Sequence, residues 1–244
     1  MQFPIGVFGV SLASATLPAV SKLWVERNPK AIEETLTDSL RMVFAVNLPA
    51  AAGLAFLGAP IIQLLFEYGR FTPVDTQATT LALAAYAVGL GAYSAVKVLV
   101  PACYAIGQTQ IAVISSVLSV VFTIALNLLL VDRLGYVGLA LGTSLAAILN
   151  SLFLLAALKK GLERAGGAFA LKPLLVSFVR SGILSLLMGA LCYVTWQGIE
   201  AGIPGLWRIL KVGLLVAEGV LFALIAARFL GVTELSSFAS RIGK

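Results

Sequence analysis

Long apolar stretches, separated by short polar segments, run the length of this 244-residue chain. Seven of them are long enough to form a membrane-spanning helix, which needs about 20 mostly apolar residues. They cover residues 3–21, 42–66, 80–104, 110–131, 135–158, 174–196 and 207–230. Strands of a membrane barrel alternate over only about 10 residues. The pattern therefore predicts an all-α integral membrane protein with about seven spans.

The segment between the first two spans has a different pattern. Asn28 is followed by a proline, which is typical of a helix N-cap with proline in the first turn. Beyond it, Ile32, Leu36 and Leu40 recur every four residues and lie opposite acidic side chains. This periodicity predicts an amphipathic helix over residues 29–41, lying on the membrane surface and leading into the second span.

The connections divide the chain into four parts. We expect five core spans with the surface helix, a cytoplasmic loop, two additional spans and a cytoplasmic tail, at residues 1–158, 159–173, 174–230 and 231–244. Residues 132–135 leave room only for a tight turn between two of the core spans. Met1 and Gln2 give the first span almost no polar flank, so we expect the chain to come from a longer protein.

The composition excludes most other classes of protein. The chain is 60% apolar and 11% charged, with a mean hydropathy of +1.01, whereas a soluble domain has about 25% charged residues. It contains no histidine and only two cysteines, so we expect no metal site and no disulfide framework. We also expect no cofactor. It has no Asp-x-Asp or Asp-Asp sequence, and Glu33 and Glu34 lie on the solvated face of the surface helix, so we do not expect a membrane enzyme. A net charge of +6 fits basic membrane-flanking loops better than nucleic-acid binding.

The basic residues predict an orientation, because cytoplasmic loops of membrane proteins are enriched in lysine and arginine. With seven spans, eleven basic residues fall on one side: Lys22, Arg27, Lys30, Arg41, Lys159, Lys160, Arg164, Lys172, Arg228, Arg241 and Lys244. Three fall on the other: Arg70, Arg133 and Arg208. We therefore expect the N-terminus of the chain outside and the C-terminus in the cytoplasm.

Four charged side chains lie inside predicted spans, away from the span ends, where a charge is costly and often functional. They are Lys97, Arg180, Lys211 and Glu218. Lys97 is either an anchor that extends to the membrane surface or a residue for pairing between helices or gating. For Glu218 we favour an ion pair, with Lys211 or Arg180 as candidates, or a neutral acid, over coupling to protons. Arg180 is expected to extend to the cytoplasmic surface.

Four segments, in order and at consistent spacing, resemble the second half of the MurJ (MviN) family of lipid II flippases. They are QFPIGVFGVSLASATLPAVSK at 2–22, LLFEYGRFT at 64–72, AVKVLVPACYA at 95–105 and GYVGLALGTSLAAILN at 135–150. The resemblance implies that the seven spans correspond to helices 8–14 of a fourteen-helix flippase. A missing N-terminal lobe of the same protein would then complete the transport cavity.

The resemblance also implies a function, a location and partners. The whole protein would move lipid II, the undecaprenyl-linked peptidoglycan precursor, across the bacterial inner membrane by alternating access. Its partners would be lipid II, the N-terminal lobe and bilayer lipids. Another exporter of polyprenyl-linked sugars or drugs from the same superfamily is an alternative, as is a membrane scaffold that transports nothing.

One face of the first span combines small and polar side chains. Its members are Gln2, Gly6, Gly9, Ala13 and Thr16. Small residues of this kind permit close helix packing, and the resemblance makes a cavity wall beside a polar headgroup an equal interpretation. Lys22 ends this segment, where it anchors the helix at the membrane surface or attracts the pyrophosphate of the substrate.

Glycines along the last two spans suggest a lipid-facing groove. In the resembled family these two helices hold the undecaprenyl tail. Gly182, Gly189, Gly213 and Gly219 would leave shallow hollows for an acyl chain. The competing interpretation is close packing of the two helices through small residues, and the sequence favours it.

Overall fold

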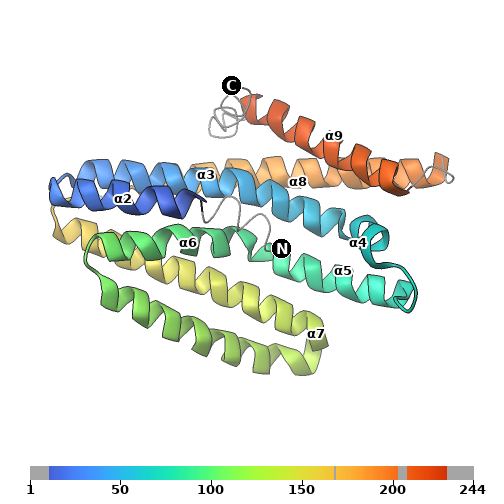
Figure 1. Cartoon of the computed structure of the whole chain (residues 1–244), viewed down its shortest axis with the longest axis horizontal. Coiled ribbons are helices and arrows are strands. Elements are labelled where there is room, and N and C mark those ends of the chain that lie inside the picture. Colours follow the sequence, from blue (N-terminus) through green and yellow to red (C-terminus); the bar gives the residue numbers. More distant parts are fainter. Residues whose placement is uncertain (1–10, 168, 203–207, 230–244) are drawn as a thin grey trace.

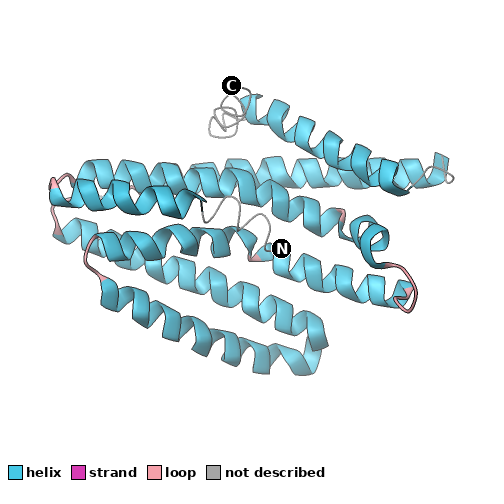
Figure 2. Ribbon diagram, viewed as in Figure 1, coloured by secondary structure: helices cyan, strands magenta, loops and turns pink. Residues whose placement is uncertain are grey.

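A computed structural model describes residues 11–167, 169–202 and 208–229 of the chain. All regular structure within these ranges is helical (Figure 2). The helices in chain order are α2 (Ser11–Val25), α3 (Pro29–Phe56), α4 (Gly58–Phe66), α5 (Pro73–Val88), α6 (Leu90–Ala105), α7 (Thr109–Arg164), α8 (Leu171–Gly202) and α9 (Arg208–Phe229). The predicted all-α class is confirmed.

The number of spans agrees with the sequence. Four helices, α3, α7, α8 and α9, are long and apolar enough to cross a membrane, and α5 with α6 forms a fifth candidate bent by 41°. The 56 residues of α7 are two helices, because Gly135 has φ 55° and ψ −134°, and Figure 1 shows them as a hairpin. This is the tight turn predicted at 132–135. Six spans are thus described, and α2 is the described part of the span predicted over 3–21.

The separate surface helix predicted over residues 29–41 is not seen. These residues form the first part of α3, which begins after the Asn28 cap and continues to Phe56. Ile32 and Leu36 are completely buried in a core formed with side chains of α2, α6, α7 and α8. The apolar stripe was correct, but it packs against other helices of the protein and not against lipid.

Helix α3 lies at the centre of the bundle. It packs against α8, α6, α2 and α5, and Figure 1 shows it between α2 and α8. Two apolar cores share it: one toward α2, α6 and α7, and another toward α8 and α9. The predicted second span, 42–66, also ends earlier than expected, because the chain breaks at Leu57 and continues as α4.

The bend between α5 and α6 is stabilised by α7. Gly89 caps α5, and the Ser144 hydroxyl from α7 donates a hydrogen bond to the Ala85 carbonyl at 2.9 Å. A Cβ at Gly89 would lie 2.8 Å from the Cα, Cβ and Oγ atoms of Ser144. The bend therefore depends on a residue without a side chain at the point where the three helices meet.

Replacing this glycine tests the contact. Gly89→Ala has to push α7 away from the bend, and such overpacking typically costs about 1–3 kcal/mol, so we expect a lower unfolding temperature in detergent. Gly213→Ala is the matched control, because a Cβ at Gly213 meets nothing within 4 Å. Equal unfolding temperatures for the two variants would contradict the close packing of α7 on the bend.

Candidate functional site

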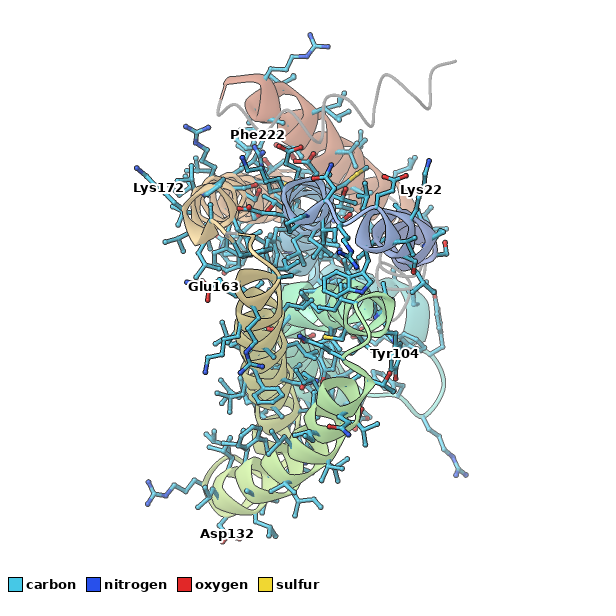
Figure 3. All side chains as sticks on the ribbon, turned by 90° about the vertical axis from the view of Figure 1, so that its left-hand side faces the viewer. Lys22, Tyr104, Asp132, Glu163, Lys172 and Phe222 are labelled. Atoms are coloured by element: carbon cyan, nitrogen blue, oxygen red, sulfur yellow. The ribbon has the colours of Figure 1, made fainter. Side chains whose placement is uncertain are left out.

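The turns of the bundle gather at two ends. The α2–α3, α6–α7 and α7–α8 connections lie at the left of Figure 1, and the α4–α5 connection, the turn within α7 and the C-terminal end of α8 lie at the right. Figure 3 looks at the left end, where Lys22, Glu163 and Lys172 are labelled. The predicted alternation of loops is therefore present, with a basic end that we expected in the cytoplasm.

The face predicted as a cavity wall is only partly described. Gln2, Gly6, Gly9 and the side chain of Ala13 lie outside the described residues. Thr16 is 3% exposed, and its hydroxyl lies 3.2 Å from that of Ser39 on α3. At Thr16 this face therefore packs against α3, which supports the packing interpretation there.

Lys22 lies at the exposed end of α2. Its ammonium is 3.9 Å from the Glu26 carboxylate one helical turn later, and both side chains are well exposed. Such a surface pair contributes little to stability. The arrangement is that of a surface anchor, and no second helix approaches Lys22 through an ion pair within the described part of the chain.

Lys97 projects from α6 away from the core. It is exposed, whereas Ser94 and Val98 on the same helix are completely buried. No ion pair involves Lys97 among the described residues. A lysine about 12 Å along a spanning helix from its end needs water or a polar partner to keep its charge. Its position therefore indicates a wet surface or contact with another part of the protein.

The described contact of Glu218 is a hydrogen bond to α8, which is compatible with the neutral-acid interpretation. Its carboxylate accepts a hydrogen bond from the Thr195 hydroxyl of α8 at 2.9 Å. Lys211 pairs instead with Glu200 of α8, with 3.0 Å between the ammonium and carboxylate atoms. Arg180 is exposed on α8 and forms no ion pair with Glu218. Two polar contacts, and not one pair, thus join α8 to α9.

The Lys211 pair is unusual in its burial. The Lys211 side chain is 3% exposed and that of Glu200 is 47% exposed, so the ammonium is covered while its partner reaches out of the protein. The Trp196 ring lies over the ammonium, 6.0 Å away, where a cation is attracted to the aromatic face. Glu200 was not predicted, because the expected span ended at residue 196, whereas α8 continues to Gly202.

Of the four groove glycines, two are covered by helix packing. A Cβ at Gly189 would collide with the Phe56 ring, and one at Gly219 would lie 3.3 Å from the Cys192 sulfur. Gly182 and Gly213 have nothing within 4 Å of the same position. A continuous groove through all four glycines is therefore absent from the described residues, and only Gly182 and Gly213 remain open.

The described residues contain no group of three or more histidine, cysteine or acidic side chains placed to hold a metal. Cys103 and Cys192 are free and buried.

Comparison with known proteins identifies the family. The family model described as "Lipid II flippase MurJ" matches residues 1–212. The chain belongs to the MurJ lipid II flippase family. A probable lipid II flippase MurJ of Vibrio cholerae is 36% identical over 166 residues, which are 68% of this chain and 31% of that protein. The corresponding protein of Rickettsia prowazekii is 36% identical over 149 residues, 61% of this chain and 29% of its own length.

A solved MurJ structure shares the fold. The lipid II flippase MurJ in an inward closed conformation is similar over 94% of this chain and 45% of its own, with a TM-score of 0.72 and 28% identity. This chain thus spans about a third of the length of these two relatives and just under half of the solved MurJ chain. The family and the apolar helices together establish a membrane protein.

The ion pair between α8 and α9 can be tested by a double-mutant cycle. Glu200→Gln leaves the covered Lys211 ammonium without its carboxylate, so we expect a lower unfolding temperature in detergent. Adding Lys211→Met removes the charge and should restore part of that loss, with a coupling of about 0.5–3 kcal/mol, the range for contacting residues. Purely additive effects of the two substitutions would show that the pair contributes nothing to the joining of α8 and α9.

Proposed function

We propose that this chain forms the C-terminal half of a flippase that moves lipid II across the bacterial inner membrane. The observation that carries the proposal is the match of the MurJ family model to residues 1–212. The solved MurJ chain is about twice as long as the part it shares with this chain. The rest of the protein would supply the other lobe and the other wall of the transport cavity.

The exposed cation on α6 supports a role in transport. Lys97 lies on a spanning helix, faces away from the core and has no ion pair among the described residues. In a flippase of two lobes, such a side chain would face the polar cavity between them, where it could attract the pyrophosphate of the lipid. Alternating access would then expose it to each side of the membrane in turn.

The last two helices would face the lipid tail. Gly182 of α8 and Gly213 of α9 are the open ones among the four predicted groove glycines, and they would leave room for an acyl chain beside the helix pair. The polar headgroup would cross through the cavity while the tail stays in the membrane. No step of this proposal requires a cofactor.

The role of Lys97 can be tested in cells depleted of their own lipid II flippase. The whole protein should sustain growth and translocate lipid II, and Lys97→Gln should slow translocation about tenfold or more, because a hydrogen bond to a charged group is worth about 1.5–3 kcal/mol. Lys97→Arg should retain most of the activity. Translocation by Lys97→Gln at the normal rate would exclude Lys97 from the cavity.

Two control measurements accompany this test. Arg133→Gln alters an exposed residue beside the turn within α7 and should leave translocation unchanged at equal expression. A polyprenyl-linked sugar without the peptide, offered in the same assay, separates lipid II from other lipid-linked substrates. Failure of the unaltered protein to move lipid II would refute the proposed function.

The orientation of the two ends gives a further test. We place the basic end in the cytoplasm, and with it the C-terminus, because it collects most of the lysines and arginines. Single cysteines at positions 164 and 70, with Cys103 and Cys192 replaced, should react with an impermeant thiol reagent from the cytoplasmic and the periplasmic side, respectively. The opposite labelling pattern would reverse the orientation.

A further inference from the structure

The basic end of the bundle contains a cavity that the proposed transport does not use. Its volume is about 320 Å³, and it is lined by Trp24, Arg27, Asn28, Pro29 and Ala165. It lies where the turn between α2 and α3 meets the end of α7, at the end of the molecule seen in Figure 3. An arginine and a tryptophan thus line one cavity at a helix end.

Arg27 occupies an unusual backbone position in this cavity. With φ 54°, it is the one non-glycine residue with positive φ among those the structure describes. It ends α2 through hydrogen bonds from its own N–H to the Trp24 carbonyl and from the Asn28 N–H to the Leu23 carbonyl. This pattern of bonds ends a helix in the left-handed conformation and usually has glycine at that position.

Two other helices at the same end close in the same way, with glycine. Gly107 after α6 has φ 75° and donates to the Tyr104 carbonyl, and Gly166 after α7 has φ 81° and donates to the Glu163 carbonyl. At two of the three helix ends, the residue with positive φ in this turn is therefore a glycine. Strain of this kind persists where surrounding structure enforces it, and it clusters at binding sites. The exception at Arg27 points to a use for its side chain.

The charges around the cavity are positive in balance. Lys22 pairs with Glu26 and Lys159 with Glu163, and the Glu33 carboxylate accepts a hydrogen bond from the Ala170 N–H at 2.6 Å. Several cations at this end are exposed and have no ion pair within the described ranges: Arg27, Lys30, Lys160, Arg164 and Lys172. Asp38 pairs with Arg41, and among the described residues at this end Glu34 is the exposed acid without an ion pair. The cavity thus lies in a field that favours an anion.

We propose that this cavity binds the phosphate of an anionic membrane phospholipid. The planar guanidinium of arginine matches two phosphate oxygens at once, and tryptophan is favoured at the level of lipid headgroups. Basic pockets between helices at the cytoplasmic side are suited to such headgroups. The volume is at the small end for ligand sites, so a glycerol phosphate fits better than a sugar-peptide headgroup. The lipid is a resident ligand of α2, α3 and α7, and not cargo.

The residues that line the cavity would each contact a different part of the phospholipid. Arg27 would bind the phosphate, while the Trp24 ring and Pro29 would pack against the glycerol and the upper acyl carbons. The Asn28 side chain already accepts from the Ala31 N–H at 3.1 Å, so it shapes the wall of the cavity. The site would thereby tie the end of α2 to the end of α7 through a lipid.

Arg27→Gly separates lipid binding from folding. The glycine removes the guanidinium and suits the positive φ, so the purified protein without lipid should melt at the same temperature or higher. Titration with phosphatidylglycerol in detergent, followed by native mass spectrometry, should show about fivefold weaker binding, the value of one arginine at a lipid surface. Phosphatidylcholine should bind both forms equally weakly.

Lys172→Gln is the matched charge control. Lys172 belongs to the same end but points outward, away from Lys22 (Figure 3), so this variant should bind phosphatidylglycerol as the unaltered protein does. Equal losses in Arg27→Gly and Lys172→Gln would show attraction to the whole basic end and overturn the site. Unchanged binding in Arg27→Gly would overturn it as well.

Two further ligands distinguish the sources of phosphate. Inorganic phosphate alone should not raise the melting temperature, and a rise equal to that given by the phospholipid would show a free-anion site instead. Lipid II should not displace phosphatidylglycerol from the cavity; displacement that depends on Arg27 would make it an entry point for substrate and refute the proposal. Binding is measured without transport, so a protein that fails to move lipid II can still confirm this site.

Discussion

The lipid interior supplies no water to an open backbone carbonyl, and this constraint governs how the helices meet. Where α5 and α6 break at Gly89, the hydroxyl of Ser144 bonds the Ala85 carbonyl, as broken membrane helices require. Beside this bend, Ser94 of α6 donates to the Asn47 amide oxygen of α3 at 2.9 Å, and both residues are completely buried. The bend is therefore held on two sides by hydrogen bonds, and α3, α6 and α7 form one fixed unit around it.

The spans that the structure describes and the tight turn within α7 could be predicted from the sequence, because length and hydropathy record where a chain crosses a membrane. Which face of each helix meets another helix could not, because lipid tails are as apolar as a leucine-rich core. For this reason Thr16 and Gly189, each compatible with a cavity, proved to be packing residues. The stripe that includes Ile32 was correctly predicted to be apolar, but it was wrongly expected to face lipid.

The contact partners of the charged residues in α9 could not be predicted from the sequence either. Glu218 and Lys211 lie seven residues apart on one helix, so helical periodicity puts them on one face and suggests a pair. Yet each bonds to α8, since Thr195 and Glu200 approach α9 at two different levels. An apolar sequence gives no signal for the relative shift of two neighbouring helices, and that shift decides the partner of a buried charge.

The two polar contacts consequently determine where α9 lies. Helix α9 packs against α8, α4 and part of α3, and its apolar side chains would be as well accommodated by lipid as by these neighbours. Apolar packing alone therefore gives little preference for one position of α9 over another. The bonds from Lys211 to Glu200 and from Thr195 to Glu218 are lost when α9 slides along α8 or moves away from it. The spacing of the last two helices, and with it the room left beside Gly213, thus depends on two carboxylates and not on the leucines that surround them.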